Sequence, residues 1–162
     1  MRNPFDSAQA RMTRSVPPRE ILDAAAARRE SLASQWFSAA QVNAGLDLKL
    51  GSGCHSASEL RRQGKLLGVY VTQPVGSYRY PTWQFRPDGQ PFERLAEILA
   101  VLRDFGPFQR EPDGLRRSTG WGEAEWFLSP HALLWGAAPA AMLSVDPARV
   151  LYAVHCEFEE DV

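Results

Sequence analysis

The order of proline and glycine in the last quarter of the chain constrains the fold more than any other feature of the sequence. Proline is tolerated at the first position of a helix but not inside it, whereas glycine often lies just after the last helical residue. Serine or aspartate directly before such a proline can cap the new helix. Residues 121–156 contain, in order, Ser129-Pro130, Gly136, Pro139 and Asp146-Pro147. This punctuation predicts short helices at 131–135, 139–143 and 148–155.

The composition is typical of a globular protein. The 162 residues are enough for one domain or two small ones, and a hydrophobic content of 44% is sufficient for a packed core. No apolar run is long enough to span a membrane, and residues 1–15 lack the apolar core of a signal peptide. We therefore expect a cytoplasmic location and no membrane partner.

The cysteines and histidines show no pattern typical of catalysis or metal binding. Cys54 and Cys156 lie far apart, which gives no metal-ligand spacing and is simplest in a reducing compartment. Cys54 is next to His55, but neighbours in a chain rarely present both side chains to one substrate. Phosphate-binding and dinucleotide-binding motifs are also absent from the sequence. We therefore expect that the chain is not an enzyme and that it needs no cofactor or metal.

Charge is divided unevenly along the chain. Residues 121–162 contain seven acidic residues and one basic residue, for a net charge of −6. Residues 1–120 hold the other 17 basic and 12 acidic residues, for a net charge of +5. A basic front and an acidic back can face different partners, although such a charge over 120 residues is also unremarkable in a protein without them.

The first half of the chain predicts a helix-turn-helix module with a wing. Residues 1–18 are polar and aperiodic and read as an N-terminal arm. Helices are expected at 19–33, 38–46 and 56–64, with 47–53 as a loop, Gly45 and Gly64 near helix ends, and Ser56 and Glu59 as a capping box. A hairpin is expected from 69–72 and 78–85, because both segments are rich in β-branched and aromatic residues.

The segment from Ser58 to Phe85 resembles the DNA-reading part of MerR-type and excisionase-type regulators. The resemblance lies in a helix ending in Arg62-Gln63-Gly64-Lys65-Leu66 and a hairpin ending in Tyr78-Arg79-Tyr80-Pro81. Short polar and cationic side chains suit contacts with base edges and phosphates. The DNA-contacting candidates are Ser56, Ser58, Arg61, Arg62, Lys65 and Arg79. The segment 47–55 is longer than the tight turn expected between the two helices, which counts against DNA binding. The alternative interpretation is that the helix at 56–64 is a solvated cationic helix that binds no DNA.

A connecting region follows in residues 91–120. Leu95, Ile98, Leu99 and Leu102 recur at helical spacing, which predicts an amphipathic helix over 92–105 ended by Gly106-Pro107. The loop after it contains Arg110, Arg116 and Arg117, which either remain solvated or contact phosphates.

The punctuated stretch at 121–156 resembles the C-terminal toxin-binding domain of the Xre/MbcA/ParS antitoxins. The matching residues are Trp126, Phe127, Leu128, Pro130, Leu133, Gly136, Pro139, Leu143 and Val150. The resemblance implies a bacterial type II antitoxin that covers a RES-domain toxin, an enzyme class that consumes NAD, and that represses its own operon by binding operator DNA as a homodimer. All of these residues except Leu143 and Val150 are the candidates for toxin contact.

The last residues, 157–162, form an acidic tail. Glu157, Glu159 and Glu160 surround Phe158. Given the resemblance, the carboxylates are candidates to occupy a basic dinucleotide cleft as phosphate mimics, with Phe158 as an apolar anchor. A solvated chain end is the alternative.

The expected fold class is therefore mainly α with one small β-hairpin: a helix-turn-helix module over 19–90, a connecting region, and a helical toxin-binding domain over 121–156. Two other functions remain open. One is a MerR-like transcription regulator without a toxin partner, and the other is an interaction adaptor that binds no DNA.

Overall fold

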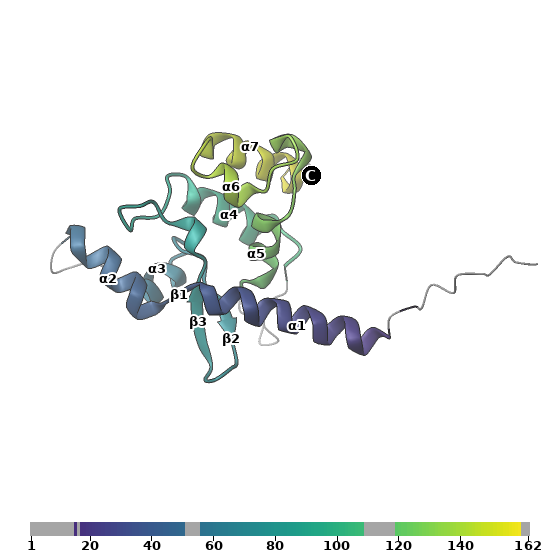
Figure 1. The fold of residues 1–162 in the computed structure, drawn as a ribbon. Coiled ribbons are helices and arrows are strands. Elements are labelled where there is room, and N and C mark those ends of the chain that lie inside the picture. Colours follow the sequence, from purple (N-terminus) through teal and green to yellow (C-terminus); the bar gives the residue numbers. More distant parts are fainter. Residues whose placement is uncertain (1–14, 16, 51–55, 109–118, 160–162) are drawn as a thin grey trace, which may run out of the picture.

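The computed structural model describes residue 15 and residues 17–50, 56–108 and 119–159, with no side-chain description for 47–50. The fold is mainly helical with one small antiparallel sheet, as predicted (Figure 1). Its helices are α1 (Pro18–Gln35), α2 (Ala39–Leu50), α3 (Ala57–Arg62), α4 (Leu95–Phe105), α5 (Trp121–Leu128), α6 (Pro139–Met142) and α7 (Pro147–Phe158). The strands are β1 (Phe37–Ser38), β2 (Val69–Val71) and β3 (Ser77–Tyr80), and the 3₁₀ turns are η1 (Thr82–Gln84) and η2 (Ala132–Leu134).

Helix α2 is longer than the sequence pattern predicted. Residues 47–50 continue the helix, so the expected loop does not begin at 47. Gly45 lies inside α2 and does not end it. A Cβ at Gly89 would lie 2.8 Å from the carbonyl oxygen of Gly45, so the turn at Gly89 packs closely against the helix at that point. Gly45 and Gly89 allow the two backbones to pack closely. From the sequence alone, a glycine in this role looks the same as a glycine that ends a helix.

Helix α3 has the predicted start and end. The Ser56 hydroxyl accepts a hydrogen bond from the Glu59 N–H at 3.2 Å, which satisfies one of the free donors at the helix start. Gly64 has φ +76°, and the Lys65 N–H donates to the Leu60 carbonyl at 2.8 Å. This is the left-handed ending that favours glycine. Asn43 of α2 accepts the Ala57 N–H at 2.7 Å, and this hydrogen bond fixes α3 against α2.

The predicted hairpin exists, but its second strand is shorter than expected and a third strand joins it. Strand β3 pairs with β2 on one side and with β1 on the other. It ends at Tyr80, because Pro81 has no N–H to continue a ladder, and η1 follows. The predicted extension of the strand to Phe85 is therefore wrong. The side chain of buried Gln84 takes the place of backbone pairing here. Its amide accepts a hydrogen bond from the Leu67 N–H and donates one to the Leu67 carbonyl, both at 2.8 Å.

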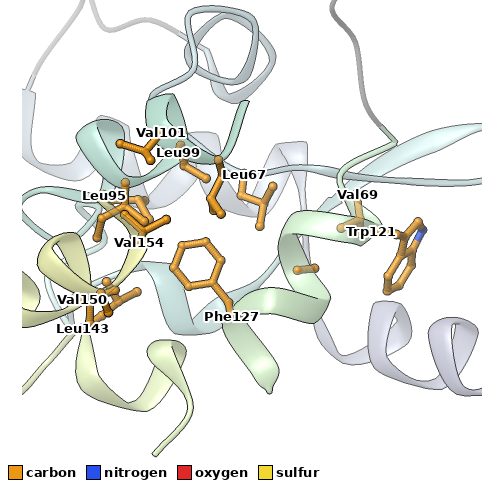
Figure 2. Close-up of a cluster of buried hydrophobic side chains, with 14 of the residues drawn as sticks. Leu67, Val69, Leu95, Leu99, Val101, Trp121, Phe127, Leu143, Val150 and Val154 are labelled. Carbon is orange, nitrogen blue, oxygen red and sulfur yellow. The ribbon is translucent and has the colours of Figure 1, made fainter. Parts of the chain in front are cut away.

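Helix α4 lies in the larger of two hydrophobic clusters. Its buried face contains Leu95, Ile98, Leu99 and Leu102, as its periodicity predicted, although the helix begins at Leu95 and not at 92. Phe127 of α5 and Val150 and Val154 of α7 pack in the same cluster (Figure 2). Leu67 and Val69, from the β2 region, also belong to this cluster. One core therefore joins the front and back halves of the chain.

The C-terminal segment begins against the sheet. The Tyr70 N–H of β2 donates to the Thr119 carbonyl at 2.9 Å, and the Trp121 indole N–H donates to the Tyr70 carbonyl at 2.9 Å. Gly120 has φ +83°, and a Cβ there would lie 2.0 Å from the Gly68 carbonyl oxygen. The chain can approach β2 this closely only with glycine at position 120. Helix α5, which starts here, was not among the predicted elements.

The predicted helix at 131–135 is instead the 3₁₀ turn η2, and Ser129 does not cap it. Ser129 ends α5, where its hydroxyl donates to the Glu125 carbonyl at 2.7 Å. The cap of η2 is His131, whose Nδ1 accepts the Leu133 N–H at 3.2 Å. The serine was assigned to the wrong helix because Ser-Pro can follow one helix as readily as it begins another.

The last two predicted helix starts are confirmed. Pro139 occupies the first turn of α6, and Pro147 that of α7. The Asp146 carboxylate accepts the Arg149 N–H at 3.0 Å as the cap of α7. Helix α7 continues through Phe158, so Glu157 and Phe158 are helical residues and do not belong to a tail. No helix in the described ranges has the length and apolar character needed to cross a membrane.

Candidate functional site

Trp135 is the most prominent exposed aromatic residue in the described chain. Its side chain is 76% exposed, and its backbone has φ +57°, a left-handed conformation that residues other than glycine rarely adopt. Exposing a large apolar ring and holding a strained backbone are both unfavourable for an isolated protein. Their combination is typical of a binding surface.

Arg149 holds Trp135 together with a second aromatic residue. Its guanidinium carbon lies 5.1 Å from the centre of the Trp135 ring and 4.8 Å from the centre of the Tyr152 ring. Its Nε also donates to the Leu133 carbonyl at 3.0 Å, which connects α7 to the η2 turn. We call Trp135, Arg149 and Tyr152 the Trp135 surface. Tryptophan, tyrosine and arginine are the residue types that dominate the energetics of protein interfaces.

The backbone around Trp135 is tied into a closed loop. The His131 N–H donates to the Ala137 carbonyl at 3.1 Å, and the Gly136 N–H donates back to the His131 carbonyl at 3.0 Å. Gly136 follows Trp135 in the left-handed region with φ +81°. Two consecutive left-handed residues reverse the chain and leave the indole on the outside. The ring is therefore positioned in advance, which reduces the entropy lost when a partner binds.

The predicted toxin-contacting residues divide between the core and the surface. Phe127 and Pro139 are buried, so the chain itself covers them. Trp126, Leu128 and Leu133 are half-buried and pack against the larger cluster. Pro130 and Gly136 are exposed. Most residues of the antitoxin resemblance therefore stabilise the helical segment 121–156 itself. The two exposed residues, Pro130 and Gly136, lie in the loop that carries the Trp135 surface.

The first residues of the predicted acidic tail are held by the protein. The Trp126 indole N–H donates to Glu157 Oε2 at 2.7 Å, and His131 Nε2 lies 2.8 Å from the same oxygen. Phe158 packs edge-on against Phe108, with ring centres 6.0 Å apart. Glu159 contacts His155. Glu160 lies outside the described residues.

The candidate DNA-contacting side chains differ in how available they are. Arg62 at the end of α3 and Lys65, three residues further on, are exposed. Arg61 instead folds back onto the wing, with its guanidinium carbon 3.6 Å from the centre of the Tyr78 ring. The Ser56 hydroxyl is used as the α3 cap. Ser58 and Arg79 are half-buried, and Arg79 pairs with Val69 and Ser38 in the sheet.

An apolar groove lies between α2 and the turn that follows η1. This groove has a volume of about 530 Å³ and is mostly apolar, with Phe37, Val42, Phe85 and Phe92 among its lining residues. Within the described ranges, no group of three histidine, cysteine, aspartate or glutamate side chains is placed to hold a metal ion. Arg110, Arg116 and Arg117 of the predicted loop and the Cys54-His55 pair lie outside the described residues.

Comparison with known proteins gives no relative for this chain. It matches no family model, no curated protein and no solved structure. The functional assignment therefore depends on the residues themselves and on their geometry.

The sequence pattern marked the segment that carries the Trp135 surface but not the side chains that form this surface. Trp135 is one of three tryptophans in that segment, and it is the exposed one of the three, with a left-handed backbone. The sequence signal for this was the following Gly136. Arg149 and Tyr152 lie three residues apart, which puts them on one face of α7. Nothing in the sequence showed that this face meets the η2 turn.

Proposed function

We propose that this chain is the antitoxin of a bacterial type II pair, which neutralises a RES-domain toxin by binding it through the Trp135 surface and represses its own operon. The observation that carries the proposal is the 76% exposure of Trp135 beside Arg149 and Tyr152. An exposed and positioned group of this composition supports a protein partner. Its place, inside the segment that resembles an antitoxin's toxin-binding domain, supports the partner's class.

The charge of the C-terminal segment supports the same partner. Residues 121–162 have a net charge of −6, and the pyrophosphate of NAD requires a basic cleft in an enzyme that consumes it. Glu157 near the end of α7 and Glu159 directly after it are exposed to solvent, although Trp126 and His155 contact them. Opposite charges would steer the two proteins together. This contribution should be seen as a decrease in the association rate when salt is added.

The experiment that tests the proposal is co-expression with a RES-domain protein encoded beside this chain. The wild-type chain should co-purify with that protein and restore growth to cells that it inhibits. Trp135→Ala should lose both properties. Phe105→Ala serves as the matched control, since Phe105 is an aromatic residue with 46% exposure on α4, and it should retain both. Growth inhibition that the wild-type chain does not relieve would reject the antitoxin function.

Operon repression is the second part of the proposal and depends on α3. Its support is that Arg62, at the end of α3, and Lys65, just after it, are exposed, and that Asn43 fixes this helix against α2. Arg61 adds a rigid contact between α3 and the hairpin through Tyr78. These features suit a module that presents cations to a phosphate backbone.

A further inference from the structure

We infer that the apolar groove beside α2 is a binding site for a small aromatic carboxylate. The groove has a volume of about 530 Å³, within the range of about 300–1,000 Å³ that is typical of small-ligand sites. It lies at the junction of the two hydrophobic clusters, since Val42 belongs to the smaller cluster and Phe92 packs against the larger one. A small molecule in the groove would therefore contact both clusters.

Aromatic side chains form much of the groove wall. Phe37, Phe85 and Phe92 all line it. The ring centres of Phe37 and Phe85 lie 5.8 Å apart, with an angle of 49° between the rings. Phe37 is 36% exposed, so a ligand that covers its ring would remove apolar surface from water. Aromatic rings favour tilted and offset contacts at about this distance, and a flat aromatic ligand can therefore extend the pair.

Two glycines leave part of the groove without side chains. Gly45 of α2 and Gly89 of the facing turn both line the groove. A Cβ placed at Gly45 would lie 3.8 Å from the Gly89 Cα, an ordinary van der Waals distance. The described residues bring no other neighbour within 4 Å of that Cβ from outside its own stretch of helix. The space in front of Gly45 is therefore open to a ligand.

The turn that forms the facing wall is fixed by backbone hydrogen bonds. The Arg86 N–H donates to the Gln90 carbonyl at 2.7 Å, and the Gly89 N–H donates to the Arg86 carbonyl at 2.9 Å. Where the chain leaves the turn, the Phe92 N–H donates to the Gln84 carbonyl at 3.0 Å. This wall is formed before a ligand arrives, which lowers the entropy lost on binding.

Arg86 gives the groove its charge. It is the one ionisable side chain among the described residues that line the groove, and this side chain is 37% exposed. Its Nη2 lies 3.3 Å from the Asp88 carboxylate, while its Nε has no hydrogen-bond partner within the described ranges. A guanidinium has five N–H donors, so Asp88 holds the group in place and leaves donors for a second carboxylate.

The other polar groups of the groove favour an anion with a single charge. Gln41 and Ser144 also line it, but both are neutral and bond within the chain. The Gln41 side-chain oxygen accepts the Ser38 N–H at 2.8 Å, and the Ser144 hydroxyl donates to the Ala141 carbonyl at 3.5 Å. Because Asp88 already offsets part of the Arg86 charge, a carboxylate suits the site better than a doubly charged phosphate.

The test is a nuclear magnetic resonance titration of the full chain with phenylbutanoate and with its neutral analogue phenylbutanol. Both should cause saturable shifts of the Gly45 and Gly89 amide signals, and phenylbutanoate should bind about 10-fold more tightly, because its carboxylate bonds to a charged donor. Arg86→Leu should remove this preference and leave the affinity for phenylbutanol unchanged. Arg103→Leu is the matched control, because Arg103 is 40% exposed, also lies beside an aspartate and does not line the groove. It should behave like the wild type.

A second variant tests whether the ligand occupies the open space at Gly45. Gly45→Leu fills that space with a side chain that favours helix, and it should abolish binding of both probes. Circular dichroism should show that α2 is retained, and Gly45→Ala, which adds only one methyl group, should show a smaller loss of affinity.

The inference would be overturned by the absence of saturable shifts at Gly45 and Gly89 up to millimolar probe. Equal affinities of the wild type for acid and alcohol would also overturn it, as would a folded Gly45→Leu variant that binds normally. None of these outcomes depends on a toxin or on DNA, so the inference can fail independently of the proposed function.

Discussion

At the scale of single residues, Gln84 shows how one side chain can hold two segments that have no strand pairing. Its amide exchanges two hydrogen bonds with the Leu67 backbone at 2.8 Å and donates a third to the Pro81 carbonyl at 3.1 Å. Gln84→Ala should lower the free energy of unfolding by about 2–4 kcal/mol, because it leaves buried backbone groups of Leu67 without partners. Urea denaturation measures this change. Gln35→Ala, at an exposed position, should change stability by less than about 0.5 kcal/mol.

Tyr80 differs from Gln84, because its buried polar group makes no hydrogen bond within the described residues. The ring is fully buried, and within the described part of the chain its hydroxyl has no hydrogen-bond partner. Tyr80→Phe removes only this hydroxyl and should leave stability unchanged or raise it by about 1 kcal/mol. Thermal and urea denaturation of the two proteins decide the sign. A loss above about 1 kcal/mol would mean that the hydroxyl is satisfied in solution.

At the scale of elements, local signals predicted the helices whose caps are local. Asp146 with Pro147 predicted α7, Pro139 predicted α6, and the apolar period predicted α4. The failures came where the meaning of a residue depends on a distant neighbour. Gly45 lies inside a helix, where Gly89 packs closely against it. Ser129 ends α5, a helix that the Pro-Gly punctuation does not mark.

The candidate site shows the same division. The helix starts of its segment were predictable, because the proline signals at Pro139 and Pro147 act locally. The Trp135 surface was not, since it needs the η2 turn and α7 to meet through Arg149. The acidic residues were expected to be free, but Glu157 is held by Trp126, 31 positions away. Hydrogen bonds over such separations leave no periodic pattern in a sequence.

The α3 element carries a prediction about DNA. Arg62→Ala and Lys65→Ala should each weaken binding to the DNA upstream of the operon. Each should also reduce the slope of log affinity against log salt by about 1, which corresponds to the loss of one phosphate contact. Fluorescence anisotropy over a salt series measures both quantities. Arg28→Ala, a surface cation on α1, should change neither. Variants with unchanged slopes would exclude α3 from DNA contact.

At the scale of the whole molecule, the chain should unfold as one unit. Phe127, which is fully buried, contacts the Trp83 ring from η1, with ring centres 4.6 Å apart, and shares its core with α4 and α7. Phe127→Ala should lower the free energy of unfolding by about 3–5 kcal/mol. Tryptophan fluorescence and far-ultraviolet circular dichroism should report one coincident transition in both proteins. Two separated transitions would show that the front and back halves are independent.

The central claim is that the Trp135 surface binds the toxin. Isothermal titration of the purified chain into a catalytically inactive form of the co-encoded RES-domain protein tests it most directly. Trp135→Ala should raise the dissociation constant by about 30-fold or more. It should leave the thermal stability of the free chain unchanged, because the ring is exposed. Phe105→Ala should bind like the wild type. Equal affinities for the wild type and Trp135→Ala would contradict the account.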